Sequence, residues 1–375
     1  MYLRKLLTAL SIVIFLTSII FAAGQKASLR ADLMKQPGIV EAQFLFMDPP
    51  FEGCHASTIE QTQDYLVSAF FAGTGEGNKD VGISLCRKRK GTNEWSAPVE
   101  VANGIQYTEV PSGEIKRWPC WNPVLYQVKG GPLLLFYKVG PNPDTWWGML
   151  KKSRNQGKNW SKARRLPQGI TGPVRAKPVM LDDGRLLCGS STEDKGWRVH
   201  MEWTRDLGRT WSRTEALNDG KEFAAIQPTI LLHGDDKIQI LCRSDGNIRQ
   251  SWSTDGGMTW SPLTKSVLPN PSAGIDAVKL PDERHLLVYN HSDDSRSQLN
   301  IAVTKDGKHW KAAVKLEDEK TVEGKKAYGA YPGAILGSDG LVHITYTWRR
   351  DRINYVAVDP EKFELKDMPD GKWPK

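Results

Sequence analysis

The segment Ser253-Thr-Asp255-Gly-Gly257-Met-Thr-Trp260 decides the fold, because its pattern recurs along the chain. The pattern is Ser or Thr, any residue, Asp or Asn, any residue, Gly, two more residues and Trp. It returns at Ser153–Trp160, at Thr204–Trp211 and, one residue shorter, at Thr304–Trp310, and a degenerate fifth copy ends at Trp95. Successive full motifs place their tryptophans 51, 49 and 50 residues apart. We therefore expect one structural unit about every 50 residues.

Each motif has the composition of a hairpin turn. The Asp side chain accepts hydrogen bonds from the amides of its own turn, and the Gly takes the backbone conformation with positive φ. The Trp then packs back under the turn and holds two neighbouring strands together. We expect these Asp residues to stabilise the fold and to take no part in chemistry.

A second landmark precedes each turn, and it is a short apolar strand followed by a turn and another apolar strand. The six first strands are Ala56–Ile59, Asn122–Leu125, Lys177–Met180, Gln227–Ile230, Asp276–Lys279 and Pro332–Ile335. Repeats of about four short strands are typical of propeller blades. The sequence thus predicts an all-β fold, a single six-bladed β-propeller over residues 38–360. The sixth unit lacks a last strand, and we expect Gln43–Phe46 to supply it and close the ring.

The ends of the 375-residue chain differ from its body. Residues 1–24 have a basic start at Arg4 and Lys5, an apolar run and small residues at its end, as in a cleaved signal peptide. An uncleaved membrane anchor is the alternative, and both place the body outside the cytoplasm, secreted or periplasmic. We assign residues 25–37 to a linker and 361–375 to a tail. We expect a monomer.

Composition narrows the classes of function. Hydrophobic residues are 39% and charged residues 25% of the chain, which excludes wholesale disorder. The net charge of +8 is scattered, so acidic small substrates are expected as partners and nucleic acid is not. Neither the seven His nor the five Cys show metal-ligand spacing, and we predict no metal and no cofactor. We favour buried free thiols, although Cys54 and Cys120 occupy matching places and could form one disulfide.

The turn motifs resemble the Asp boxes of the sialidase (neuraminidase) superfamily, whose fold is a six-bladed propeller. The resemblance covers nearly all of the chain after the leader. Sialidases clamp the substrate carboxylate with three arginines and use a Tyr nucleophile, an assisting Glu and an Asp acid/base. By resemblance, Arg243 is the second clamp arginine and Arg296 the third, and Tyr331, in Ala-Tyr-Pro-Gly-Ala, is the nucleophile.

This chain departs from the family pattern at three places. His55 stands where the first clamp arginine is expected, and Gln227 stands where the assisting Glu would lie. The acid/base loop Phe71–Gly77 contains Glu76 but no Asp before Asp80. The resemblance therefore implies the fold and part of an anion clamp, without the full catalytic set. We take Tyr331, Glu76 and His55 as the candidate catalytic residues.

Candidate binding residues follow from the expected architecture, because the innermost strands of a propeller line its axis and ligands bind at one mouth. Polar residues at the strand entries and at the ends of the next strands would then meet. A group of cations in one channel would need an anion such as a carboxylate or sulfate. The candidates for substrate binding, beyond Arg243 and Arg296, are Lys177, Lys138, Gln227, Asp276, Asn122, Glu193 and Asn290.

Three functions remain open on this basis. The first is an exo-acting glycoside hydrolase of sialidase type that releases a terminal acidic sugar. The second is different sugar chemistry on the same fold, such as uronate elimination or hydrolysis of another glycoside, with His55, Glu76 or Tyr331 moving protons. The third is a glycan-binding propeller without catalysis. We expect an enzyme, because proton-moving residues and an anion clamp are predicted at one mouth.

Overall fold

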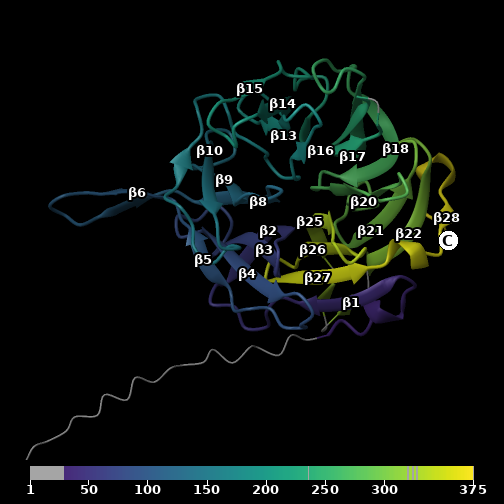
Figure 1. Ribbon diagram of the computed structural model, residues 1–375, viewed down its shortest axis with the longest axis horizontal. Helices are drawn as coiled ribbons and strands as arrows, with labels where there is room; N and C mark the ends of the chain where they lie inside the picture. The colour runs from purple at the N-terminus through teal and green to yellow at the C-terminus, as the bar shows by residue number, and fades with distance from the viewer. Residues whose placement is uncertain (1–28, 235, 319–320, 323–324, 327, 375) are drawn as a thin grey trace, which may run out of the picture.

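Six antiparallel sheets surround a common axis in the computed structural model, which describes residues 29–234, 236–318, 321–322, 325–326 and 328–374 (Figure 1). The predicted leader at residues 1–24 lies outside the described residues. In blades 1 to 5 the first strand in the chain faces the axis, and in blade 6 the inner strand is β25 (Gly329–Leu336). The predicted all-β six-bladed propeller is therefore confirmed.

The first three blades follow the chain in order. Blade 1 contains β2 (Gly53–Gln61), β3 (Tyr65–Gly73), β4 (Gly82–Arg89) and β5 (Val99–Ala102). Blade 2 contains β8 (Cys120–Gln127), β9 (Leu133–Val139), β10 (Trp147–Ser153) and β11 (Arg164–Arg165). Blade 3 contains β12 (Val179–Met180), β13 (Leu186–Thr192), β14 (Arg198–Thr204) and β15 (Ser212–Arg213).

The last three blades include two irregular ones. Blade 4 contains β16 (Ala225–Leu232), β17 (Ile238–Ser253) and β18 (Thr264–Pro271). Blade 5 contains β19 (Asp276–Lys279), β20 (His285–Tyr289), β21 (Gln298–Thr304), β22 (Trp310–Asp318) and the added strand β28 (Lys366–Asp367). Blade 6 contains β25 (Gly329–Leu336), β26 (Val342–Trp348), β27 (Arg352–Val358) and β1 (Ile39–Phe44).

Smaller elements decorate this ring. The strands β6 (Ile105–Thr108) and β7 (Ile115–Arg117) form a hairpin that projects from the propeller between blades 1 and 2 (Figure 1). A second short hairpin joins β23 (Thr321–Val322) and β24 (Lys325–Lys326). Three 3-10 turns complete the list: η1 (Leu33–Lys35), η2 (Pro360–Lys362) and η3 (Pro369–Gly371).

The N-terminal strand closes the ring as the sequence predicted, although it begins four residues earlier. β1 pairs antiparallel with β27, with Ala42 opposite Val356 and Phe44 opposite Asn354. Before it, Arg30 is buried and forms an ion pair with Glu317 of blade 5 at 2.9 Å. By pairing with β27, the first strand of the chain covers the edge that this last strand of blade 6 would otherwise expose, and it ties the two ends of the ring together.

In blade 4 the long strand β17 takes the place of the two middle strands of the other blades. The first half of β17 pairs with β16, and the second half pairs with β18. The side chains of Gln239 and Gln250 share a 2.8 Å hydrogen bond, although an extended chain would separate them by roughly 35 Å. The chain must therefore reverse between them, and Gly246, with φ of +72°, lies in the short turn.

The Asp boxes have the structural role that the sequence predicted. Asp206 accepts from the backbone N–H of Arg209 and of Thr210 at 2.8 and 2.9 Å, and Thr204 accepts from Gly208 N–H at 2.9 Å. The indole of Trp211 donates to the carbonyl of Gly208 at 3.0 Å. Hydrogen bonds to the carboxylate lower the pKa of Asp206 to about 2. The same contacts recur in the box from Ser253 to Trp260.

Four of the innermost strands carry the same irregularity near the axis. Their pairing shifts by one residue, and the residue at the shift has positive φ: Ala56 (56°), Asn122 (27°), Gln227 (56°) and Tyr331 (55°). A β-bulge of this kind re-aims side chains and is frequent beside functional sites. In blade 6 the equivalent residue is therefore Tyr331, and the sequence-based choice of Pro332 as the entry residue was wrong by one position.

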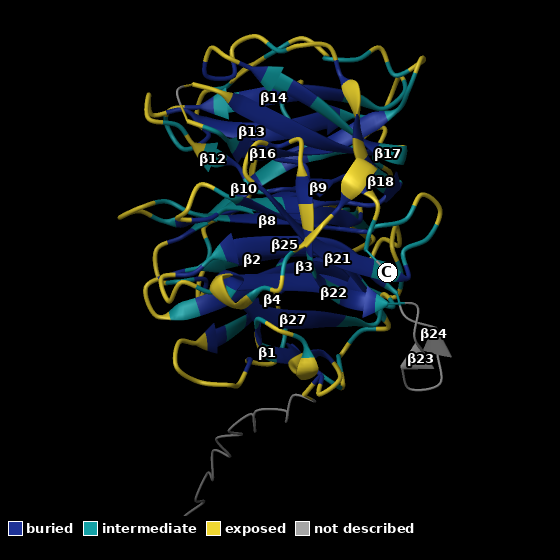
Figure 2. Cartoon of the chain, turned by 90° about the vertical axis from the view of Figure 1, so that its right-hand side faces the viewer, coloured by how far each residue is buried: buried dark blue, intermediate teal, exposed yellow. Residues whose placement is uncertain are grey.

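The core lies within and between the blades, where the strands are buried and the connecting loops are exposed (Figure 2). All five cysteines are buried and free, so the alternative disulfide between Cys54 and Cys120 is not formed. No helix among the described residues has the length and apolar character needed to cross a membrane.

Candidate functional site

Tyr331 lies at the centre of the candidate site. It sits at the bulge of β25 in the left-handed region of backbone conformation, which a bulky residue adopts only when its surroundings impose it. Its side chain is 7% exposed. Residues from four other blades surround its ring, so the propeller brings together residues that are far apart in the sequence, as predicted.

Three arginines surround the Tyr331 ring. The guanidinium carbons of Arg175, Arg243 and Arg296 lie 5.2, 5.6 and 5.6 Å from the ring centroid. These distances fit cation–π contact. Arg243 and Arg296 were predicted as clamp residues. Both also contact Ser272: Arg243 donates to its hydroxyl, and Arg296 donates to its backbone carbonyl at 2.6 Å. We call Arg175, Arg243 and Arg296 the arginine ring.

Arg243 links the Tyr331 hydroxyl to its neighbours. One of its Nη atoms donates to the hydroxyl of Tyr331 and lies 3.4 Å from the side-chain carbonyl of Gln227. The guanidinium also covers the indole of Trp197 at 4.8 Å. Gln227 thus lies in the site as predicted, and its neutral amide serves as an acceptor for Arg243.

Arg175 was missed by the sequence analysis, which selected Lys177 two residues later. Its side chain is 1% exposed, and Nη2 donates to the carbonyl of Pro332 in blade 6. Its Nε and Nη1 atoms are buried without a hydrogen-bond partner among the described residues. Burial, with a further contribution from Arg243, lowers the pKa of Arg175 to about 10, so it stays charged at neutral pH. Two free donors on a buried cation suit an incoming carboxylate.

His55 packs against Tyr331 from blade 1, where the family pattern has an arginine. The two ring centroids are 4.2 Å apart, and Nδ1 of His55 lies 2.9 Å from the hydroxyl of Thr347. Nε2 is buried without a partner among the described residues. Burial and the positive charges of Arg350 and the arginine ring hold the pKa of His55 well below its usual value. The imidazole is therefore neutral at pH 7.

Asp276 and Lys177 were both predicted to bind substrate, but they form an ion pair with one another. Nζ of Lys177 lies 3.2 Å from a carboxylate oxygen of Asp276. Asp276 also accepts from the N–H of Ala334 at 2.9 Å and lies 3.3 Å from the hydroxyl of Thr229. These contacts join blades 3, 4, 5 and 6. The predicted pair therefore acts as a structural tie beneath the site.

Two predicted binding residues have structural partners instead. Lys138 is buried and donates to the carbonyl of Pro173 at 2.6 Å, and burial lowers its pKa to about 7. Asn290 is buried and donates to the carbonyls of Gln298 and Gly329, both at 2.7 Å. Both side chains connect adjacent chain segments. The remaining candidate, Asn122, is buried at the bulge of β8.

Glu76 occupies the loop where a proton donor was expected, and it forms an ion pair with Arg350. The side chains of Glu76 and Arg350 are 34% and 44% exposed, so both are in contact with solvent. Asp80 folds the same loop by accepting from the N–H of Thr74 at 2.7 Å and from its hydroxyl at 2.8 Å. The predicted proton donor Glu76 is therefore placed by a pairing with Arg350 at the solvent-exposed side of its loop.

Glu193 is the carboxyl group with the properties of an acid at neutral pH. It follows β13 directly and is half-buried beside Arg243 and Asp144. Burial raises the pKa of Glu193 to about 7, with Asp144 adding to the rise and Arg243 opposing it. Four residues later, Trp197 supports Arg243. The turn 193–197 thus connects this carboxyl group to the arginine ring.

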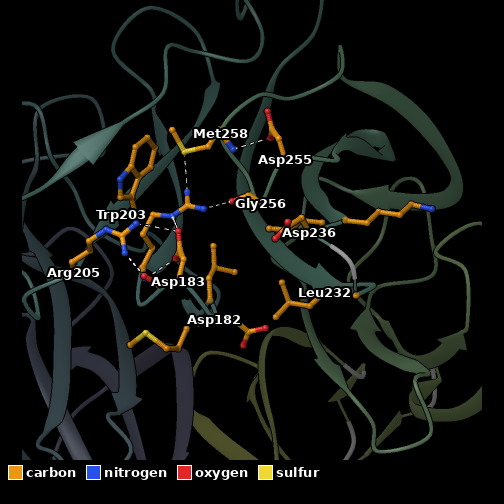
Figure 3. Close-up of a pocket in the computed structure, with 15 residues that line it drawn as sticks. Asp182, Asp183, Trp203, Arg205, Leu232, Asp236, Asp255, Gly256 and Met258 are labelled. Carbon is orange, nitrogen blue, oxygen red and sulfur yellow. Dashed lines mark hydrogen bonds and ion pairs between the residues drawn. The ribbon is translucent and has the colours of Figure 1, made fainter.

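A separate pocket of about 520 Å³ lies between blades 3 and 4, beside an Asp box (Figure 3). Several of its charged groups have partners within it: Asp183 pairs with Arg185 and with Arg205, and Asp255 accepts from the N–H of Met258. None of the predicted site residues lines it. It is therefore distinct from the arginine ring.

Comparisons with known proteins agree with this architecture. Residues 64–344 match the family described as the BNR repeat-like domain. No curated protein sequence matches the chain. Among solved structures, a protein of unknown function from Dyadobacter fermentans is 16% identical with a TM-score of 0.69, and the match covers 87% of this chain and 99% of that one.

Two sialidase structures are similar as well. The NanB sialidase from Streptococcus pneumoniae is 12% identical with a TM-score of 0.65, over 86% of this chain and 71% of that one. The Trypanosoma rangeli sialidase in complex with sialic acid is 15% identical with a TM-score of 0.60, over 91% of this chain and 60% of that one. Identities this low establish the fold alone. The chain belongs to the BNR repeat-like domain family and is a divergent member with the six-bladed fold of sialidases.

Proposed function

We propose that the protein is an exo-acting glycoside hydrolase that releases a terminal acidic sugar from a glycan. The arginine ring around Tyr331 carries this proposal. Three guanidiniums converge there, and two buried atoms of Arg175 have no partner in the part of the chain that the structure describes. Like charges at this spacing repel one another unless an anion joins them. A carboxylate is the anion whose two oxygens match several guanidinium donors at once.

Tyr331 has the position expected of a nucleophile in this reaction. A carboxylate held by the arginine ring would place the adjoining anomeric carbon near the Tyr331 hydroxyl. Arg243 already donates to that oxygen and holds it in place. The neutral imidazole of His55, whose ring centroid lies 4.2 Å from that of Tyr331, is the base that takes the hydroxyl proton as the oxygen attacks. The fold similarity to a sialidase in complex with sialic acid supports an acidic sugar as the class of substrate. From the leader sequence we place this activity outside the cytoplasm.

Product release tests the proposal. The purified protein is incubated with a set of glycosides that end in a sialic acid, a related keto acid sugar or a uronic acid, and the free sugars are identified by mass spectrometry. We expect one acidic sugar to be released, and we expect Tyr331→Phe to reduce the release by at least a hundredfold. Full release by Tyr331→Phe would contradict the nucleophilic role. Binding of an acidic glycan without any product would instead support a propeller that only binds glycans.

A second function, elimination from a uronate, is favoured by His55. Its neutral imidazole carries an unpartnered buried Nε2 beside Tyr331, so it can accept a proton. In this reaction the base removes the proton on the carbon next to the carboxylate, and the arginine ring stabilises the resulting anion. The bond to the leaving oxygen then breaks, a carbon–carbon double bond forms, and the oxygen takes up a proton.

The two reactions give different products from the same incubation. Elimination yields an unsaturated sugar that absorbs in the ultraviolet and has lost the elements of water relative to the hydrolysis product. An unsaturated product that disappears in His55→Gln would establish elimination. A saturated acidic sugar as the only product would establish hydrolysis.

A further inference from the structure

The turn 193–197, which contacts Arg243 of the arginine ring through Trp197, also lines a second pocket, and this position suggests what lies on the other side of the scissile bond. This inference rests on the proposed function. The pocket has a volume of about 510 Å³ and lies between blades 2 and 3. Its lining includes Trp146 and Trp147 at the start of β10, Arg165 of β11, and Glu193 and Arg198 around the β13–β14 turn.

The turn 193–197 forms a wall shared by this pocket and the arginine ring. At one end Glu193 lines the pocket, and at the other Trp197 lies under Arg243 at 4.8 Å. Asp194 and Gly196 are joined by a bridge that tightens the turn, and Arg198 forms a 3.0 Å ion pair with Asp194. A molecule bound to the arginine ring therefore has this pocket as its neighbour across Glu193.

The pocket has the chemistry of a sugar site. Trp146 and Trp147 supply half-buried indole surfaces, and aromatic faces of this kind pack against the apolar faces of sugar rings. Arg165 covers the ring of Trp147 at 4.4 Å, and the ring of Trp146 meets that of Trp121 edge-on, with the two centroids 6.0 Å apart. Charges of both signs line the remaining wall, so hydroxyl groups find both donors and acceptors there.

We propose that this pocket holds the sugar on the leaving-group side of the scissile bond, and that Glu193 donates the proton to the departing oxygen. The bond between the anomeric carbon and that oxygen breaks, and its electron pair stays on the oxygen. The oxygen takes the carboxyl proton of Glu193. As that bond breaks, the Tyr331 oxygen bonds to the anomeric carbon and loses its proton to His55. A water molecule then displaces the Tyr331 oxygen, which takes its proton back from His55, and the water gives one of its own protons to the Glu193 carboxylate. The sum is glycoside plus water giving two alcohols.

The surroundings of Glu193 are compatible with a protonated carboxyl group at neutral pH. Arg243 of β17 approaches it from blade 4, and Asp144 approaches it from the loop before β10. The other charged groups around the pocket are Arg165, Asp194, Lys195, Arg198, His200, Arg213 and Glu215. Of these, Arg198 is paired with Asp194, and His200 lies 2.9 Å from Glu202. Burial outweighs the attraction of Arg243 and raises the pKa of Glu193 to about 7.

Leaving-group dependence tests the role of Glu193. Two substrates with the same acidic sugar are compared: a 4-methylumbelliferyl glycoside, whose leaving group needs no protonation, and an oligosaccharide such as sialyllactose or a uronate analogue, whose alkoxide leaving group does. We expect Glu193→Gln to reduce kcat on the oligosaccharide by about a hundredfold or more and on the aryl glycoside by less than tenfold. A residue with only a structural role would affect both substrates alike.

Trp146→Ala tests the pocket independently of proton transfer. We expect it to raise KM for the oligosaccharide by about tenfold, the effect of one lost aromatic contact, and to leave KM for the aryl glycoside within twofold. Trp118→Ala is the matched control, because Trp118 is 38% exposed and does not line this pocket. Circular dichroism and the melting temperature verify that each variant is folded.

The outcomes separate this inference from the proposed function. Equal losses on the two substrates in Glu193→Gln, or an unchanged oligosaccharide KM in Trp146→Ala, would overturn the inference while leaving the hydrolase intact. Absence of turnover by the wild-type protein on every acidic glycoside would overturn both. Selective loss on the oligosaccharide in both variants would establish the pocket and the proton donor.

Discussion

The rings of His55 and Tyr331 form a tilted contact, with centroids 4.2 Å apart and an interplanar angle of 47°. Burial and the surrounding arginines hold the pKa of His55 well below its usual value, so protonating it is unfavourable in the folded protein. A sialidase-type clamp has an arginine, which is always charged, at the place of His55. The charge of His55 depends instead on pH and on whether the protein is folded.

His55 should make the protein less stable in mild acid. The unfolded chain binds a proton at this position near pH 6.5 and the folded chain does not, so the free energy of unfolding falls as pH drops below about 6.5. The loss is absent above that value. In His55→Gln, the fall in melting temperature between pH 7.5 and pH 5 should be smaller than in the wild-type protein. An identical fall in both proteins would contradict the neutral state of His55.

Arg175→Met should separate binding from stability. Removing a buried cation that has two unpartnered atoms relieves a desolvation penalty, so we expect a melting temperature equal to or above that of the wild type. Affinity for an acidic monosaccharide should fall by about tenfold to a hundredfold, the effect of one lost charge-assisted hydrogen bond. Calorimetric titration and thermal melts measure the two quantities. The exposed Arg205→Met serves as control, and unchanged affinity in Arg175→Met would place the anion elsewhere.

Asp276→Asn should weaken the whole ring. The carboxylate joins Lys177, Thr229 and the N–H of Ala334, and its replacement leaves the lysine without its partner. We expect a loss of about 2–4 kcal/mol in the free energy of unfolding, as for other buried ion pairs that lose one member. Asp367→Asn is the control, because that side chain is 83% exposed and should change stability by less than about 0.5 kcal/mol. Equal effects in urea denaturation would contradict the axial role.

Glu193→Gln should stabilise the protein in alkaline solution. The folded state binds a proton up to about pH 7 and the unfolded state only up to about pH 4.5, so the free energy of unfolding decreases between these values as pH rises. The amide does not titrate and escapes this loss. The difference in melting temperature between variant and wild type should therefore increase from pH 4 to pH 8. A constant difference would show that the Glu193 carboxyl group is not perturbed.

Much of the fold could be predicted from the sequence because its decisive signals are local. An Asp box forms its own hydrogen bonds within eight residues, so Asp206 and Trp211 identify a hairpin wherever they occur together. The closing strand was predictable because the sixth unit lacked a partner. The reversal within β17 and the projecting β6–β7 hairpin lie outside the repeated motif. The repeat pattern therefore did not predict them.

The site was harder to predict because side-chain direction depends on the bulges. Tyr331, Arg243 and Arg296 were identified correctly as neighbours, although they come from three blades. Lys138 points toward the carbonyl of Pro173, and no sequence pattern distinguishes that direction from the axis. Arg175 precedes the landmark residue Lys177 by two positions, and both lie in the irregular segment before β12, where the repeat pattern does not indicate which side chain reaches Tyr331.

The location of a bound acidic sugar is the most direct test of the central proposal. A crystal structure of the protein with a carboxylate-bearing monosaccharide at millimolar concentration would provide it. We predict the carboxylate within hydrogen-bond distance of Arg175, Arg243 and Arg296, with the sugar ring beside Tyr331. A sugar seated in the pocket between blades 3 and 4, or an arginine ring that stays free of it at saturating concentration, would contradict the assignment of this site.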